Sequence, residues 1–238
     1  MLDTLDLTLR LDKAEYKAEL LELQLRLREL MLRCYHEKQS VIVVFEGWDA
    51  AGKGGAIRRM TAKLDPRGYH VYAIAAPRQG KHRHYLWRFW RRLLPPEEKQ
   101  LVIFDRSWYG RVLVERVEGF AAENEWKRAY REINDFERQL SDSGALVVKF
   151  FFHIDPDEQA RRFEARRLTP HKNWKLTDED WRNRGRWPDY EAAIEEMLVR
   201  TSTRTAPWTL VEGNDKRHAR VKCQRRLVEA LEAHLGES

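Results

Sequence analysis

The chain contains a short stretch in which glycine and lysine have the spacing of a phosphate-binding loop. Gly47 and Gly52 are separated by four residues, and Lys53 follows directly. Between a buried strand and a helix, such a loop directs backbone N–H groups at an anion, and the lysine reaches the next phosphate. The alternative is a glycine-rich strand-to-helix turn with a solvated lysine. The residues expected to bind phosphate here are Gly47, Ala50, Ala51, Gly52, Lys53, Gly54 and Gly55.

Two positions in this loop bear on a metal ion. In the usual pattern the lysine is followed by Ser or Thr, whose hydroxyl holds Mg²⁺, but here that position is Gly54. The nearest carboxylate is Asp49. A carboxylate in a phosphate-binding loop repels its ligand unless a cation lies between them. We therefore expect Asp49 to be a metal ligand, and the alternative is that it caps the turn.

A second pair of charged residues follows another apolar run. Asp105 ends the run 101–104, and Arg106 is the next residue. In nucleotide-binding sheets, a carboxylate at the carboxyl edge of such a strand holds Mg²⁺ beside the phosphate loop. The adjacent guanidinium is placed to neutralise charge that develops on a transferred phosphoryl group. The alternative, a helix cap and an ordinary ion pair, is credible for either residue alone and weaker for both together.

The elements that must position these residues alternate between strands and helices, which predicts an α/β fold. Residues 5–11 and 21–27 alternate leucine with polar residues, as a strand does, but Tyr16, Leu20, Leu23, Leu27 and Leu30 have helical spacing. We expect a helix there, packed beside the sheet or against a second subunit. Apolar runs predict strands at 41–45, 70–75, 101–104, 146–153 and 208–211, and helices are predicted at 13–38, 53–64, 123–143, after Asp155, after Thr177, from 188 to about 201, and after Asp215.

Two segments are strongly basic. Residues 78–92 hold six Lys or Arg and no acid, and residues 161–175 hold six against one acid. The first is either a solvated face or a track for a polyanion. The second is interrupted by Pro170, and we expect a mobile lid over about 160–187 that closes on phosphates. Within the first segment, Trp87 and Trp90 are three apart on a predicted helix, and we expect both to face the protein core.

Composition limits the remaining choices. The 238 residues, 42% of them hydrophobic, suit one domain over 1–238, and no repeat or low-complexity linker is visible. No run has the roughly 18 to 20 apolar residues of a membrane span, and the first residues lack the features of a secretory signal. Cys34 and Cys223 have no metal-binding spacing, which favours a reducing, cytoplasmic location. The formal net charge of +6 suggests an anionic partner.

Several longer motifs resemble those of one family. The order of elements, with a phosphate loop after the first strand and Asp-Arg after the third, is similar to the three-layer P-loop kinase fold, with a parallel five-stranded sheet and a basic helical lid. The segments Glu-Gly-Trp-Asp-Ala-Ala-Gly-Lys-Gly-Gly (46–55), Phe-Asp-Arg-Ser-Trp-Tyr (104–109), Trp-Lys-Leu (174–176), Ala-Pro-Trp (206–208) and Asn-Asp-Lys-Arg (214–217) resemble the polyphosphate kinase 2 family.

This resemblance implies site residues and roles. It implies that Asp49, Lys53, Asp105, Arg106 and Arg166 are catalytic, with Arg166 in the lid. Asp49 and Asp105 would hold Mg²⁺ or Mn²⁺, although Asp49 could instead orient the acceptor oxygen. Gly54 agrees with the family, whereas Thr169 stands where many members have Asp, which leaves the lid contacts open.

The expected activity is transfer of the terminal phosphoryl group of inorganic polyphosphate to an adenine nucleotide. The run 104–120, with Gly110 after Trp-Tyr, is similar to members that phosphorylate AMP, whereas relatives that phosphorylate diphosphates often have Asn there. The alternatives are polyphosphate-dependent phosphorylation of ADP, an ATP-dependent nucleoside monophosphate kinase, and a basic nucleic-acid-binding module. We expect a homo-oligomer that binds neither nucleic acid nor membrane.

Overall fold

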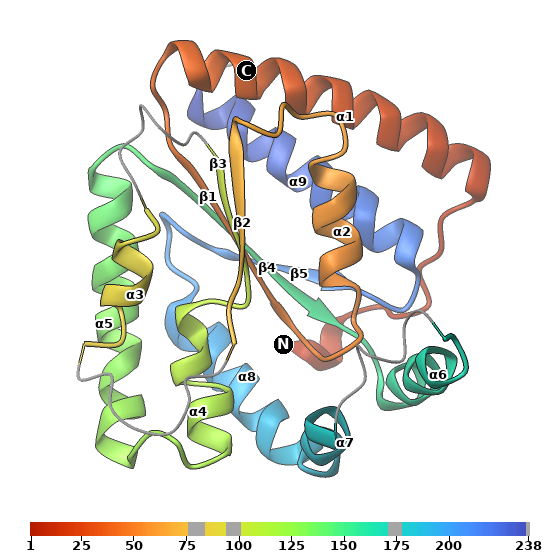
Figure 1. The fold of residues 1–238 in the computed structure, drawn as a ribbon, viewed down its shortest axis with the longest axis vertical. Coiled ribbons are helices and arrows are strands. Elements are labelled where there is room, and N and C mark those ends of the chain that lie inside the picture. Colours follow the sequence, from red (N-terminus) through yellow and green to blue (C-terminus); the bar gives the residue numbers. More distant parts are fainter. Residues whose placement is uncertain (76–83, 94–100, 171–177, 237–238) are drawn as a thin grey trace.

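A computed structural model describes residues 1–75, 84–93, 101–170 and 178–236. Its centre is a parallel sheet, whose strands lie in the order β2-β3-β1-β4-β5 (Figure 1). All the strands predicted from apolar runs are present. They are β1 (Val41–Gly47), β2 (Tyr69–Ala73), β3 (Leu101–Asp105), β4 (Leu146–His153) and β5 (Trp208–Glu212).

The central strand β1 is apolar and buried on both faces, because helices cover both sides of a parallel sheet. Val43 lies opposite Ile103 of β3 and Val148 of β4. The same register sets Phe45 opposite Asp105. Since parallel strands end at the same edge, the loop after β1 and the Asp105–Arg106 turn after β3 are neighbours.

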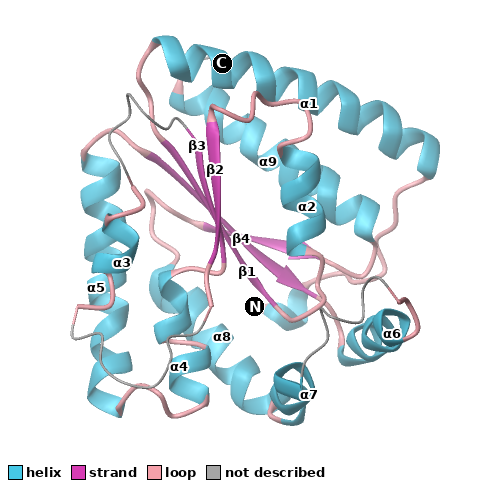
Figure 2. Cartoon of the chain, viewed as in Figure 1, coloured by secondary structure: helices cyan, strands magenta, loops and turns pink. Residues whose placement is uncertain are grey.

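Helices form a layer on each face of the sheet (Figures 1 and 2). On one face, α1 packs along α9, and α2 contacts α9 as well. On the other face, α5 contacts β4 and α8, and α4 packs against α8. The bounds are α1 (Lys13–His36), α2 (Lys53–Met60), α9 (Lys216–His234), α3 (Trp87–Trp90), α4 (Val114–Val117), α5 (Glu123–Asp142) and α8 (Trp187–Thr201), with the short 3-10 turns η1 (Leu2–Thr4) and η2 (Trp108–Arg111).

Helices α6 (Pro156–Arg167) and α7 (Asp178–Gly185) lie together near the carboxyl end of β4 (Figure 1). As predicted, Asp155 caps α6, accepting a hydrogen bond from the Glu158 N–H at 2.7 Å, and Pro156 occupies the first turn. These two helices are the described parts of the expected lid. Residues 171–177, which hold the Trp-Lys-Leu motif and the predicted cap at Thr177, lie outside the described residues.

A buried charged network ties the second helical layer to the sheet. Lys149 of β4 is completely buried, and its Nζ donates to Glu137 Oε2 (2.7 Å), Tyr109 Oη (2.8 Å) and the Thr201 carbonyl (2.8 Å). Removing one partner of such a buried pair typically costs about 3–5 kcal/mol. The network therefore fixes Tyr109, and with it the chain that follows Asp105 and Arg106.

The prediction that Trp87 and Trp90 face the core is wrong for Trp87, and Trp90 is only partly covered. Trp87 is 62% exposed, and Trp90 is 37% exposed with its ring edge against Phe136. The single turn α3 instead points the intervening Phe89 inward, against Phe104 and Trp108. A turn this short buries only one narrow face. Residues 78–83 of the same basic segment lie outside the described residues.

Two further observations bear on the sequence-based expectations. Cys34 and Cys223 are both buried and free. Within the described part of the chain, no helix is long and apolar enough to cross a bilayer.

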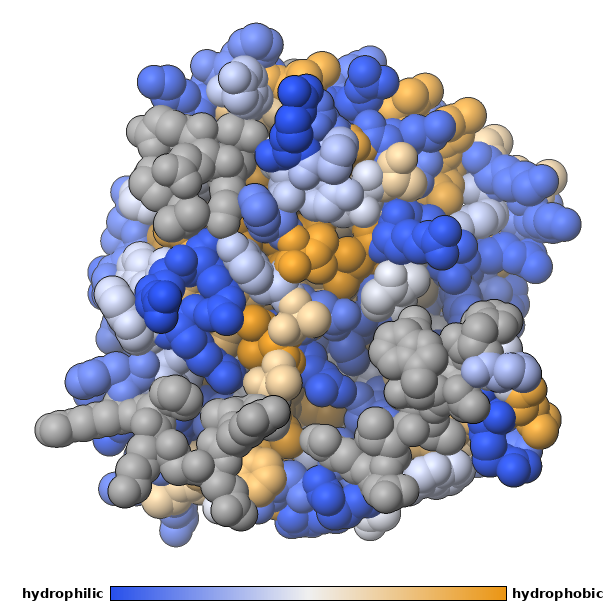
Figure 3. Space-filling view, in the orientation of Figure 1, coloured by the Kyte–Doolittle hydropathy of each residue, from blue (hydrophilic) through white to orange (hydrophobic). Residues whose placement is uncertain are grey.

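Figure 3 shows hydrophobic surface over the edge strand β2, where Val71 is 43% exposed.

Candidate active site

The loop after β1 has a backbone that requires glycine at defined positions. Gly47 has φ of +136°, and a Cβ there would lie 2.3 Å from the Phe152 carbonyl oxygen of β4. Gly52, which caps α2, has φ of +117°. Ala50 also adopts a positive φ, of +63°, which a residue with a side chain rarely does. The loop is thus held in a tight turn whose last residues open the helix α2.

Lys53 is buried in this loop and is not solvated. Its Nζ donates to the carbonyl oxygens of Gly47 (2.7 Å) and Trp48 (3.0 Å). Burial, followed by the neighbouring Arg106, lowers the pKa of Lys53, although Asp49 and Asp105 act in the opposite direction. Both carboxylates therefore lie close enough to the Lys53 ammonium to raise its pKa.

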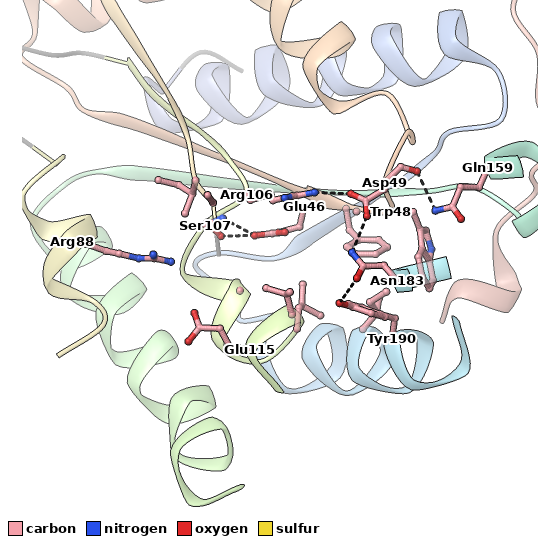
Figure 4. A pocket seen from close by; sticks show the side chains of 18 residues that line it. Glu46, Trp48, Asp49, Arg88, Arg106, Ser107, Glu115, Gln159, Asn183 and Tyr190 are labelled. Atoms are coloured by element: carbon pink, nitrogen blue, oxygen red, sulfur yellow. Dashed lines mark hydrogen bonds and ion pairs between the residues drawn. The ribbon is translucent and has the colours of Figure 1, made fainter. Parts of the chain in front are cut away.

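Asp49 and Arg106, from the turns after adjacent strands, form an ion pair. Arg106 Nη2 lies 2.6 Å from Asp49 Oδ1, and Asn183 of α7 donates to Asp49 Oδ2 at 3.3 Å (Figure 4). Burial raises the pKa of Asp49, but Arg106 and Lys53 outweigh it and hold the pKa below its usual value. Asp49 is therefore ionised at neutral pH. Arg106 has φ of +64°, and backbone strain of this kind is concentrated at functional sites.

Asp105 lies beside the first turn of α2. A Cβ on Gly54 would be 3.9 Å from Asp105 Oδ2, so the absent side chain at position 54 leaves room next to this carboxylate. A buried carboxylate that sequence analysis missed, Glu46, anchors the turn that follows β3. Its Oε1 accepts hydrogen bonds from both the N–H and the hydroxyl of Ser107, each at 2.8 Å. A charged residue directly before Gly47, at the end of an apolar strand, was the available signal for it.

The carboxylates beside the phosphate loop suit Mg²⁺ better than a metal ion whose ligands all come from the protein. Among the described residues, no three His, Cys, Asp or Glu side chains are grouped so as to hold a metal. Mg²⁺ usually uses one or two carboxylates together with substrate phosphates and water. Asp105 fits this role beside Gly54. Asp49 would share its oxygens with Arg106 and Asn183.

Arg166 is the expected site residue that the structure leaves apart from the others. It lies partly exposed near the end of α6, one turn after Arg162. Within the described residues, it makes no hydrogen bond or ion pair with the phosphate loop. The structure thus brings Asp49, Lys53, Asp105 and Arg106 together and leaves Arg166 at the rim.

A cavity extends from the loop between the sheet and the second helical layer (Figure 4). Asp49 and Arg106 line it beside the loop, and Arg88 and Glu115 lie farther from the loop. Gly110 lines it, and a Cβ there would lie 3.8 Å from both Glu115 Oε1 and Val114 Cγ1. Most of the remaining wall is apolar, formed by Ile74, Leu113, Val114, Phe151, Tyr190 and Ile194.

One wall of the site contains Trp48, whose contact with Trp187 no local sequence signal indicated. The rings of Trp48 and Trp187 are stacked, with centroids 3.5 Å apart and planes at 6°. Trp48 Nε1 donates to His153 Nδ1 at 3.0 Å. Burial lowers the pKa of His153, so the neutral ring is the acceptor. Tyr190 and Asn183, which meet at 3.3 Å, complete this wall from α8 and α7.

Comparison with known proteins finds similar sequences over almost the whole chain. Residues 10–237 match the family model described as polyphosphate kinase 2. The chain is 55% identical over 233 residues to a polyphosphate:AMP phosphotransferase of Pseudomonas syringae pv. tomato, covering 98% of this chain and 46% of the relative. It is 42% identical to ADP-polyphosphate phosphotransferase 2 of Rhizobium meliloti, covering 93% of this chain and 72% of the relative.

A solved structure described as a putative polyphosphate kinase 2 from Pseudomonas aeruginosa is also similar. It superposes with a TM-score of 0.94 at 55% sequence identity, over 100% of this chain and 51% of that one. The chain spans about half the length of the first curated relatives it matches.

Proposed function

Because the chain belongs to the polyphosphate kinase 2 family, we propose that it transfers the terminal phosphoryl group of inorganic polyphosphate to AMP, forming ADP. The observation that carries this proposal is the cavity beside the phosphate loop. The Asp49–Arg106 pair lines it next to the loop, and most of its remaining wall is apolar. Such a cavity suits a nucleoside whose phosphate faces the loop. The name of the Pseudomonas syringae relative, polyphosphate:AMP phosphotransferase, supports the choice of substrates.

In the proposed reaction, the loop amides and Lys53 hold the terminal phosphoryl group of the polymer. An oxygen of the AMP phosphate attacks that phosphorus in line and forms the new O–P bond. The bond to the next phosphate breaks, and polyphosphate leaves one unit shorter. Arg106 neutralises the charge that spreads over the transferred group, and Arg166 joins it when the lid closes. Asp49, through its ion pair, orients Arg106.

The carboxylates Asp105 and Asp49 would hold Mg²⁺, which when bound neutralises phosphate oxygens. The protein needs no nucleophilic side chain, because positioning and charge stabilisation account for most catalysis of phosphoryl transfer. We therefore assign no covalent role to Ser107, although it is buried within the site.

Gly110 supports AMP over ADP as the acceptor. Its position on the cavity wall leaves free the space that a larger side chain would fill. AMP must place its α-phosphate where ADP places its β-phosphate, so AMP has to enter deeper by one phosphate. A wall without a side chain at position 110 favours this deeper entry.

Initial rates with AMP and with ADP, at equal polyphosphate and Mg²⁺, test the proposal, with ATP tried in parallel as the donor. We expect the higher kcat/KM for AMP and no transfer from ATP at a comparable rate. A higher kcat/KM for ADP would overturn the choice of acceptor and leave polyphosphate as the donor. Transfer from ATP alone would overturn the donor.

A further inference from the structure

Side chains of helix α6 donate hydrogen bonds to three successive backbone carbonyl groups of the phosphate loop. Gln159 Nε2 donates to the carbonyl oxygen of Asp49 at 3.2 Å. Arg162 Nη1 donates to those of Ala50 (2.9 Å) and Ala51 (2.8 Å). The two α6 residues are three apart and therefore lie on the same face of the helix.

Arg162 also joins this loop to the segment after β5. Its Nη2 donates to the carbonyl oxygens of Gly213 (2.6 Å) and Asn214 (3.0 Å), and its Nε pairs with Glu158. Arg162 is 5% exposed and so is not part of the basic surface expected over 161–175. Burial lowers the pKa of Arg162 to about 10, which leaves it charged at neutral pH.

These contacts determine where the loop amides point. A trans peptide is planar, so the N–H of each residue points opposite to the carbonyl of the residue before it. With three carbonyls turned towards α6, the N–H groups of Ala50, Ala51 and Gly52 point away from it. Ala51 N–H is used within the loop, by the Trp48 carbonyl at 3.1 Å. Among the described residues, none accepts a hydrogen bond from the N–H of Ala50 or Gly52.

We propose that Arg162, assisted by Gln159, is a positioning residue that holds the loop carbonyls outward so that the amides of Ala50 and Gly52 face the phosphate. This role rests on the proposed function, in which the loop binds the terminal phosphates of the donor. Arg162 touches neither substrate. It also stabilises the positive φ of Ala50, a conformation that alanine does not favour by itself.

The test is Arg162→Lys, with Arg226→Lys on the exposed side of α9 as the matched control. Lysine keeps the charge, but its single ammonium cannot serve four carbonyls as the planar guanidinium does. We expect hydrogen exchange, measured by mass spectrometry on a peptide spanning 46–56, to become several-fold faster. Affinity for tripolyphosphate should fall about tenfold, and affinity for AMP should change less than about twofold. R226K should match the wild type in all three.

Unchanged exchange of the loop in R162K would overturn the proposal. So would an equal loss of affinity for tripolyphosphate and AMP in a folded variant, because a purely structural tie predicts no such split. If R162K does not fold, Glu158→Gln weakens the support of Arg162 more gently. The same changes are then expected at about two- to threefold, and their absence counts against the role. Failure of the wild type to bind tripolyphosphate would count against the proposed function, while loop exchange still decides the role of Arg162.

Discussion

Lys53 is hydrogen-bonded to the backbone of the phosphate loop, and a bound phosphate would have to replace these hydrogen bonds. Its ammonium contacts the carbonyl oxygens of Gly47 and Trp48. A phosphate oxygen offers the same ammonium a charged acceptor in place of neutral ones, and hydrogen bonds between ions are the stronger kind. The lysine is therefore aimed by the loop before any substrate arrives.

Replacing Lys53 by methionine keeps the side-chain length and removes the charge. We expect kcat for polyphosphate-dependent ADP formation to fall about 10²- to 10³-fold, because the charge acts on the group in transfer. Steady-state rates with purified protein measure this, and circular dichroism checks the fold. Lys63→Met, on the exposed turn after α2, is the control and should keep wild-type turnover. Wild-type turnover in K53M would remove Lys53 from the mechanism.

Asp105→Asn tests the carboxylate beside Gly54. If this carboxylate holds Mg²⁺, the variant should lose turnover by about 10²-fold and need a higher Mg²⁺ concentration for half its maximal rate. Rates over a Mg²⁺ titration measure both effects, with Asp65→Asn on an exposed turn as the control. An unaltered Mg²⁺ dependence would show that the metal is held elsewhere.

Gly110→Asn tests the choice of acceptor. The added side chain would start 3.8 Å from Glu115 Oε1 and Val114 Cγ1, so there is room for its Cβ while the cavity becomes smaller. We expect the ratio of kcat/KM for AMP to that for ADP to fall about tenfold. The control is Gly119→Asn, at a positive φ with open space around it, which asparagine tolerates. A ratio unchanged in G110N would mean that position 110 does not select the acceptor.

Elements contribute by fixing which loops meet at the site. Strand β5 is joined to α9 by Glu212, whose carboxylate lies 2.7 Å from Lys222 Nζ and 3.2 Å from His218 Nε2. Burial raises the pKa of Glu212, but these hydrogen bonds outweigh it and bring the pKa to about 2. The link holds the start of α9 next to Gly213, and Arg162 bonds to the Gly213 carbonyl.

This link makes a prediction about pH. Because the folded pKa lies below that of the unfolded chain, the stabilisation is complete above about pH 4.5 and is lost as the pH falls towards 2. Glu212→Gln should lower the free energy of unfolding at pH 7 by about 1 kcal/mol, a value reduced for solvent screening, and Tm by about 2–4 °C. Thermal scans from pH 7 to pH 3 measure the difference, which should shrink on acidification. Glu229→Gln, on exposed α9 surface, is the control, and a pH-independent difference would refute the electrostatic cause.

At the scale of the whole molecule, the described basic side chains of the two basic segments lie on or just after α3 and on α6, and Arg88 among them lines the cavity. Hydrophilic side chains gather over α3 in Figure 3, and Arg88, Arg91 and Arg92 belong to this segment. On α6, Arg161 and Arg167 are exposed, whereas Arg162 is buried. The track predicted for a polyanion therefore has one cation fewer than the sequence count, and residues 78–83 and 171–175 lie outside the described residues.

If these segments guide a polymer, long-chain polyphosphate should lose affinity steeply as salt is added, while AMP loses little. Titrations between about 50 and 300 mM salt, with tripolyphosphate as the short-chain control, measure the slopes. Equal slopes for the long and the short chain would argue against an extended track. Sequence-independent binding of DNA without phosphoryl transfer would favour the nucleic-acid alternative. The mass of the protein in solution tests the separate prediction of a homo-oligomer.

The sequence by itself determined the strands, most helices and the residues at the ends of β1 and β3. Buried parallel strands are nearly continuous apolar runs, and the glycine spacing of 47–52 has few other uses after such a strand. Since parallel strands end at one edge, the proximity of Lys53 to Asp105 also followed from local patterns. These inferences needed only neighbours in sequence and the general geometry of a sheet.

Only the tertiary structure decided which distant groups complete the site. The contacts of Arg162 with Ala50 and Gly213 join positions more than 50 residues apart along the chain, and no periodicity encodes them. The stacking of Trp48 on Trp187 and the burial of Phe89 in place of Trp87 have the same origin. A side chain's partners depend on how whole elements pack, because a helix of any composition presents several faces, and only its neighbours determine which one is buried.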